Sequence, residues 1–135
     1  MRIFLDANIL FSAARSDGAI RRLVELLQSS GHTACMDAFV AEEARRNLVA
    51  KAPAALPDLD LLLAAMERLP TLSLDRTLLA EIPLPEKDQP VLAAAIRGRC
   101  DVLITEDRSH FGPLFGTEYQ GVTIYSPAEA AESLL

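Results

Sequence analysis

Short apolar runs alternate along this chain with longer segments that carry apolar residues at helical spacing, and this alternation constrains the fold more than any other feature. The run Ile3-Phe4-Leu5 contains no polar residue, which is typical of a strand buried on both faces of a parallel sheet. Val102-Leu103-Ile104 has the same character. Such strands, separated by helices, predict an α/β fold: a three-layer α/β/α sandwich around a mostly parallel central sheet of about five strands.

The chain has the length of one domain, which we place over residues 1–135. We find no internal repeat and no low-complexity tract in the sequence. The expected strands are residues 3–6, 33–36, 71–74, 101–105 and 122–125. The expected helices are residues 9–15, 19–29, 38–51, 59–69, 76–81, 91–97 and 127–135. The last of these begins with a capping signal, Ser126-Pro127 followed by Glu129.

The charge balance limits the partners that the chain can bind. The net charge is −6, from 13 Lys and Arg against 19 Asp and Glu, so the chain is not a polyanion binder that works by bulk charge. No apolar run is long enough to span a membrane. The N-terminus loosely resembles a signal peptide, but Asp6 and Asn8 interrupt its apolar region. We therefore expect a cytoplasmic protein without a membrane partner.

Four acidic residues occupy positions from which they can meet. Asp6 ends the first strand, Asp107 follows the fourth, Asp88 lies at the head of a helix, and Glu43 lies in the first half of helix 38–51. If the first and fourth strands are neighbours, Asp6 and Asp107 emerge at the same edge of the sheet, where open α/β sheets bind ligands. Taken singly, each has an ordinary explanation as a strand end or a helix cap.

Helix geometry separates two adjacent glutamates. At ~100° per residue, Val40, Ala44 and Leu48 form the core-facing stripe of helix 38–51. Glu43 falls at the edge of that stripe, whereas Glu42 points nearly the opposite way. We therefore expect Glu43 to face the edge of the sheet and Glu42 to be a solvated surface charge.

Four unpaired carboxylates at one place would repel one another and shift toward the neutral form. A divalent cation would relieve that repulsion, and ligands that are all oxygen favour Mg²⁺ or Mn²⁺ over zinc. A site of this type suits hydrolysis of a phosphodiester, in which the metal activates a water molecule and offsets charge on the leaving oxygen. One of the carboxylates can accept the proton from that water.

At this level of detail the chain resembles the PIN-domain family, close to the VapC-type toxin ribonucleases. Four segments carry the resemblance, in the order in which they occur in the family. They are Phe4-Leu5-Asp6-Ala7-Asn8, residues 40–48 (VAEEARRNL), residues 87–95 (KDQPVLAAA) and residues 101–111 (DVLITEDRSHF).

The resemblance implies roles for particular residues. Asp6, Glu43, Asp88 and Asp107 match the acidic quartet that binds Mg²⁺ or Mn²⁺ in the family. Asn8 matches the small polar residue after the first acid, and Thr105 and Ser109 match polar positions that support the last acid. The implied activity is endonucleolytic cleavage of single-stranded or structured RNA. Many members of the family are toxins that a small antitoxin neutralises, and many form homodimers.

Five other residues have competing interpretations. Glu106 adds charge beside the quartet but is expected to face water, and Asp101 begins its strand and therefore lies at the far end of the sheet. Arg15 and Arg108 can contact RNA phosphates. His110 is interpreted as a surface loop histidine, because the metal mechanism does not need it.

Two other functions compete with the ribonuclease. A haloacid-dehalogenase-like phosphatase also carries an Asp at the end of its first strand, but it needs a second Asp two residues later, where this chain has Asn8. A non-catalytic PIN-like module that binds RNA or protein is the other alternative. The presence of all four acids argues against it, and RNA association without metal-dependent turnover would favour it.

Overall fold

The computed structural model describes residues 1–71 and 76–135, and its centre is a six-stranded sheet. The strand order is β3-β2-β1-β4-β6-β5, and only β5 runs antiparallel to its neighbour. The strands are β1 Arg2–Leu5, β2 Thr33–Met36, β3 Glu67–Arg68, β4 Val102–Ile104, β5 Glu118–Tyr119 and β6 Val122–Tyr125. The predicted α/β class and mostly parallel sheet are therefore confirmed.

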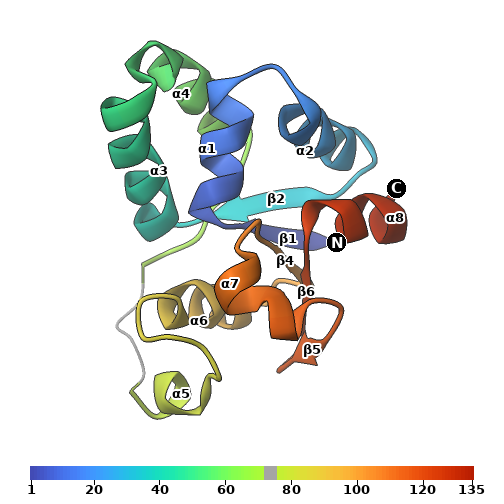
Figure 1. Ribbon diagram of the computed structural model, residues 1–135. Coiled ribbons are helices and arrows are strands. Elements are labelled where there is room, and N and C mark those ends of the chain that lie inside the picture. The colour runs from blue at the N-terminus through green and yellow to red at the C-terminus, as the bar shows by residue number, and fades with distance from the viewer. Residues whose placement is uncertain (72–75) are drawn as a thin grey trace.

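Helices cover both faces of this sheet. They are α1 Ala7–Arg15, α2 Ala19–Ser29, α3 Ala38–Lys51, α4 Leu56–Ala64, α5 Arg76–Glu81, α6 Gln89–Arg97, α7 Arg108–Phe111 and α8 Pro127–Leu134, with 3₁₀ turns at Pro53–Ala55 and Gly112–Leu114. Helices α1 to α4 lie on one side of the sheet and α5 to α7 on the other, while α8 lies beside α2 (Figure 1). No helix in the described ranges is both long enough and apolar enough to cross a membrane.

The two most apolar strands lie side by side at the centre. In β1, Phe4 stands opposite Cys35 of β2 and Leu103 of β4. Phe4 and Leu103 are completely buried, because helices pack on both faces of these strands. The first and fourth expected strands, β1 and β4, are neighbours in the sheet, so the condition for Asp6 and Asp107 to emerge at the same edge is met.

The segment before the undescribed residues differs from the prediction. The helix expected over 59–69 is α4, which starts earlier and ends at Ala64. The chain then turns, with the Ala65 amide donating to Leu62 O, and β3 pairs with β2 through Cys35 and Glu67. The apolar composition of this stretch predicted a continuous helix, so the two-residue edge strand β3 was not predicted. The Arg2 guanidinium forms an ion pair with Glu67 of this strand. The strand expected at 71–74 lies almost entirely outside the described residues.

The C-terminal part follows its local signals. The Ser126 hydroxyl accepts from the Glu129 amide while the Glu129 carboxylate accepts from the Ser126 amide, so the predicted capping box of α8 is present. Strand β5 was not predicted, because its two residues, Glu118–Tyr119, have no apolar pattern. The two termini lie close together, since His32 contacts both the Met1 amino group and the Leu134 carbonyl (Figure 1).

Candidate metal centre

The edge of the sheet where β1 and β4 end carries a cavity of about 290 Å³. All four predicted acids line it, and each comes from a different part of the chain: Asp6 after β1, Glu43 on α3, Asp88 before α6 and Asp107 after β4. Asn8, which was expected to support the first acid, also lines the cavity. Crossover connections of a parallel sheet therefore bring together residues as far apart in the sequence as Asp6 and Asp107.

Asp6 is the most buried of the four acids, with 6% of its surface exposed. One carboxylate oxygen caps α1 by accepting from the Ala7 amide at 2.7 Å, and the other accepts from the Thr105 hydroxyl at 2.8 Å. Burial raises the pKa of Asp6 to about 6, and the charges of Glu43 and Asp88 add to that rise. The hydrogen bonds from Thr105 and Ala7 act in the opposite direction and favour the ionised form.

Thr105 and Asn8 tie the end of β1 to the loop after β4. The Asn8 amide nitrogen donates to the Thr105 hydroxyl oxygen at 3.1 Å, and the Asn8 amide oxygen accepts from the Glu106 backbone N–H at 3.0 Å. The Thr105 hydroxyl oxygen also accepts from the Asp107 backbone N–H at 3.2 Å. Because Thr105 is fully buried, this network fixes Asp6 and Asp107 relative to each other.

Asp88 and Asp107 face each other across His110. The His110 ring nitrogen Nδ1 lies 2.9 Å from Asp107 Oδ2 and 3.0 Å from Asp88 Oδ2. Only the contact with Asp107 has the direction of a hydrogen bond, so Asp88 Oδ2 is buried without a hydrogen-bond partner among the described residues. Burial raises the pKa of Asp88 and the charge of Asp107 adds to this rise, while His110 and Lys87 oppose it.

The position of Asp88 leaves its carboxylate available. Asp88 occupies the N-cap position of α6, as its place in the sequence suggested, but its side chain makes no capping hydrogen bond. Asp107, in contrast, caps α7 by accepting from the His110 backbone N–H at 3.1 Å. One ligand atom from each of Asp88, Asp107 and His110 lies within 4.8 Å of the others.

The two adjacent glutamates of α3 are separated as helix geometry predicted. Glu43 is half-buried and lines the cavity, whereas Glu42 is exposed and lies outside it. Glu43 is close enough to Asp6 for its charge to raise the pKa of that residue. Glu43 lies outside the tight set formed by Asp88, Asp107 and His110. The four acids therefore divide into Asp88 and Asp107, which contact His110, and Asp6 and Glu43, which lie elsewhere on the cavity wall.

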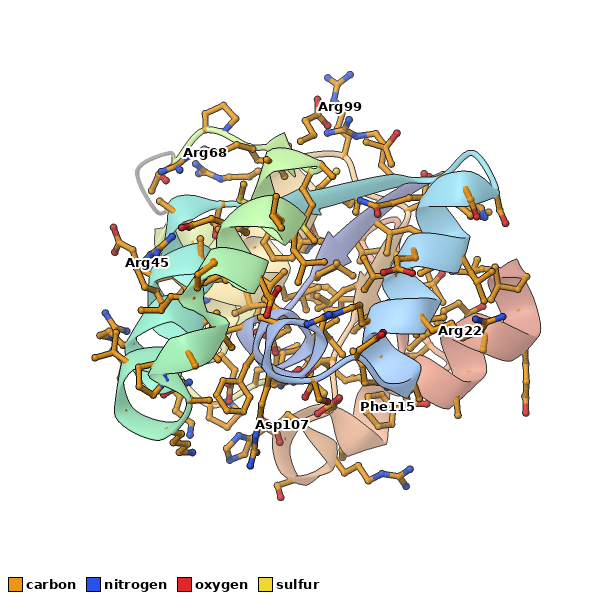
Figure 2. All side chains as sticks on the ribbon, turned by 90° about the horizontal axis from the view of Figure 1, so that it is seen from above. Arg22, Arg45, Arg68, Arg99, Asp107 and Phe115 are labelled. Carbon is orange, nitrogen blue, oxygen red and sulfur yellow. The ribbon has the colours of Figure 1, made fainter. Side chains whose placement is uncertain are left out.

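The remaining predicted residues lie around this centre in different ways. Ser109 is exposed and makes no hydrogen bond to the acids among the described residues, and Arg108 is exposed and does not line the cavity. Glu106 is exposed and accepts from the Ser12 hydroxyl. Asp101 lies at the opposite end of the sheet, where it accepts from the Arg2 amide. Figure 2 likewise shows Asp107 at one side of the molecule and Arg68 and Arg99 at the other.

Sequence reasoning missed several residues at the cavity. The interpretation of His110 as an ordinary surface histidine was wrong, because its half-buried ring contacts two of the acids. Its spacing of three residues from Asp107, which is one helical turn, was the available signal. The residues that line the cavity and were not predicted are Phe11, Phe39, Asn47, Lys51, Lys87 and Val91.

A second cavity of about 210 Å³ shares Phe39 with the acidic cavity as a lining residue. Its walls are mainly apolar and include Leu69, Pro70 and Pro90. Asp37 also borders it, but its carboxylate caps α3 by accepting from the Val40 amide at 3.1 Å. Among the described residues, this cavity therefore lacks the set of acids that lines the first cavity.

The chemistry of the acidic cavity fits a divalent cation. The four acids offer oxygen ligands, which hard cations such as Mg²⁺ and Mn²⁺ prefer. The unbonded oxygen of Asp88 and the raised pKa of Asp6 are both costs of leaving these carboxylates uncompensated. A bound cation would offset both. Among the described residues, His110 contacts Asp88 and Asp107, whereas the lysines on the cavity wall, Lys51 and Lys87, form no ion pair with the acids.

Comparison with known proteins identifies the family. A family model described as PIN domain matches residues 2–109. VapBC2 from Rickettsia felis, solved bound to a DNA fragment from its promoter, contains a chain with 17% identity and a TM-score of 0.70, and the match covers 93% of this chain and 98% of that one. VapBC-1 from nontypeable Haemophilus influenzae matches with 13% identity and a TM-score of 0.66, over 95% of this chain and 99% of that one.

No curated protein sequence matches the chain. At these low identities the two structural matches show a shared fold. The family model, however, spans most of the sequence and includes all four acids. The chain therefore belongs to the PIN-domain family.

Proposed function

We propose that this protein is a metal-dependent endoribonuclease that hydrolyses phosphodiester bonds of RNA at the cavity formed by Asp6, Glu43, Asp88 and Asp107. The observation that carries the proposal is the convergence of these four carboxylates, from four separate elements, on one cavity. One of their oxygens, Asp88 Oδ2, is buried without a hydrogen bond from any described residue. Structural acids are normally paired or capped when buried, so this arrangement suits the binding of a cation.

The residues at the cavity would have two roles, as ligands of the metal ion and as positioning residues. Asp88 and Asp107, whose carboxylates both contact His110, offer two ligands, and Asp6 and Glu43 add ligands from elsewhere on the cavity wall. A divalent ion held there would supply the activation of a water molecule and the stabilisation of charge on the phosphate. Thr105 and Asn8 would act as positioning residues, because they hold Asp6 and the backbone of Asp107 in place through hydrogen bonds.

We further propose that the protein acts in the cytoplasm as the toxin of a toxin–antitoxin pair. Support comes from the likeness of its fold to chains of two VapBC structures and from the resemblance of its sequence to VapC-type toxins. The expected partner is a small DNA-binding antitoxin, encoded by a short reading frame immediately upstream of this coding sequence. Co-purification of that partner and loss of cleavage in its presence would test the pairing.

The test of the activity is cleavage of a single-stranded RNA with and without Mg²⁺ or Mn²⁺. We expect cleavage only with metal, and loss of at least about a hundredfold in rate for Asp6→Asn, since catalysis would depend on this ligand. Asp17→Asn is the matched control, because Asp17 is exposed and lies outside the cavity. Equal cleavage by the wild type and Asp6→Asn would rule out the proposed site, and RNA binding without turnover would favour the non-catalytic module.

A further inference from the structure

Two stripes of side chains lead away from the acids along neighbouring helices. On α3, Phe39, Glu43, Asn47 and Lys51 follow one another at intervals of four residues, and all of them line the acidic cavity. Residues four apart lie on the same face of a helix. The face of α3 that carries Glu43 at the site therefore continues to Lys51 at the end of the helix.

Helix α1 carries the matching stripe, Ala7, Phe11 and Arg15, again at intervals of four. Ala7 is the residue whose amide binds the Asp6 carboxylate, and Phe11 lines the cavity. Arg15 is exposed at the last position of the helix. At 1.5 Å per residue, Arg15 lies about 12 Å along α1 from Ala7, the same displacement that separates Lys51 from Glu43 on α3.

The two stripes meet at Phe11. The Arg15 guanidinium lies 5.7 Å from the centroid of the Phe11 ring, and the Lys51 ammonium lies 5.7 Å from the same centroid. A cation over an aromatic face is held by the ring quadrupole. Phe11 thus brings two positive charges from separate helices together, in a protein whose net charge is −6.

We propose that Arg15 and Lys51, braced by Phe11, form a clamp for a backbone phosphate of the RNA strand, upstream or downstream of the bond that is cut. This inference rests on the proposed function and extends it from the reacting phosphate to the strand that carries it. Phe11 and Lys51 line the same cavity as the acids, so the clamp lies beside the cleavage site. The clamp therefore requires a substrate strand that extends beyond the cleavage site on that side.

The charges in and beside the acidic cavity support a nucleic acid strand as the ligand of the clamp. The acids attract a metal ion and repel a bare polyanion, so the strand needs cations beside the metal centre in order to stay bound. Arg15 and Lys51 supply them beside Phe11, which lines the acidic cavity, and phosphate contacts of this kind position a strand without reading its sequence. Both cations also occupy the last positions of their helices, where a positive charge stabilises the helix, so the test must measure RNA binding as well as stability.

The experiment measures equilibrium binding of a short fluorescent single-stranded RNA by anisotropy, with Ca²⁺ replacing Mg²⁺ because Ca²⁺ also takes oxygen ligands. We expect Lys51→Gln and Arg15→Gln each to weaken binding roughly three- to tenfold, as for loss of one partly screened charged contact. The salt dependence of binding should fall by about 0.7 in log–log slope for each variant. Lys51→Arg should bind as the wild type does.

Arg22→Gln is the matched control, because Arg22 is exposed on α2, well apart from Asp107 (Figure 2). Thermal unfolding of every variant shows whether a loss of binding reflects a loss of fold. The inference is overturned if Lys51→Gln and Arg15→Gln bind RNA no more weakly than Arg22→Gln, or if they lose only the binding of a protein partner. If the wild type binds RNA through these residues but cleaves none in Mg²⁺ or Mn²⁺, the clamp stands and the proposed ribonuclease fails.

Discussion

Replacing Asp6 with asparagine should stabilise the metal-free protein at neutral and alkaline pH, although it should abolish activity. Asp6 is buried, and the pKa of its carboxyl is raised to about 6 from an ordinary value of 3.8. The folded state therefore binds the Asp6 proton more tightly than the unfolded state does. As pH rises from about 4 to about 6, ionisation of Asp6 costs the folded state free energy, and above that range the whole cost is present.

The rise in the pKa of Asp6 determines how much Asp6→Asn should change the free energy of unfolding. At 1.36 kcal/mol per pKa unit, a rise from 3.8 to about 6 corresponds to about 3 kcal/mol. Asparagine carries no charge and avoids this cost, but it cannot accept both hydrogen bonds that Asp6 accepts from Ala7 and Thr105. Loss of one of them costs about 1 kcal/mol. The expected net stabilisation is therefore about 2 kcal/mol at about pH 8. Below about pH 4 the ionisation cost is absent, only the lost hydrogen bond remains, and Asp6→Asn should be less stable than the wild type by about 1 kcal/mol.

Urea unfolding of the wild type and Asp6→Asn in EDTA, at a series of pH values, measures this difference. Asp17→Asn serves as the control, because it removes an exposed carboxylate outside the cavity. A saturating concentration of Mn²⁺ should stabilise the wild type by about 2.7 kcal/mol at a hundred times the dissociation constant, and Asp6→Asn by much less. A difference between wild type and Asp6→Asn that does not change with pH would refute the reasoning.

Three further variants probe the surroundings of Asp6. Glu43→Gln should lower kcat/KM for RNA cleavage by at least about a hundredfold, whereas Glu42→Gln should stay within about twofold, because Glu43 alone of the two lines the cavity. Thr105→Val removes a hydrogen bond that lowers the pKa of Asp6, so the acid limb of the kcat/KM profile should move to higher pH; an unmoved limb would separate Asp6 from that ionisation. His110→Ala should lower the free energy of unfolding in EDTA by roughly 1–2 kcal/mol, since two carboxylates lose a polar partner, and by less in Mn²⁺; equal losses in both media would contradict this role of His110.

Local patterns predicted the parts of the fold that they control. The apolar run of β1 and the capping signals of α8 determine their own structure within a few residues, and both were predicted. Glu67–Arg68 forms a strand only because β2 offers it an edge and Arg2 pairs with Glu67. These tertiary contacts make Glu67–Arg68 a strand, although the apolar segment before them favours a helix. No local sequence pattern predicts such contacts.

The site divides in the same way. The strand-end and helix-face rules placed all four acids correctly at one cavity. They did not find His110, Phe11 or Lys51, because the importance of these residues depends on which elements become neighbours. His110 matters because α7 brings it between two acids, and Phe11 because the Lys51 ammonium reaches its ring from another helix.

Diffraction from a crystal soaked in Mn²⁺, with the anomalous signal of manganese recorded, would test the metal centre most directly. We predict an anomalous peak inside the acidic cavity, at about 2.0–2.3 Å from carboxylate oxygens of Asp88 and Asp107 and with Asp6 or Glu43 completing the ligands. The same soak of Asp6→Asn crystals should give a weaker peak or none. A wild-type cavity without a peak, in crystals where other sites have taken up Mn²⁺, would contradict the assignment of these four acids as a metal site.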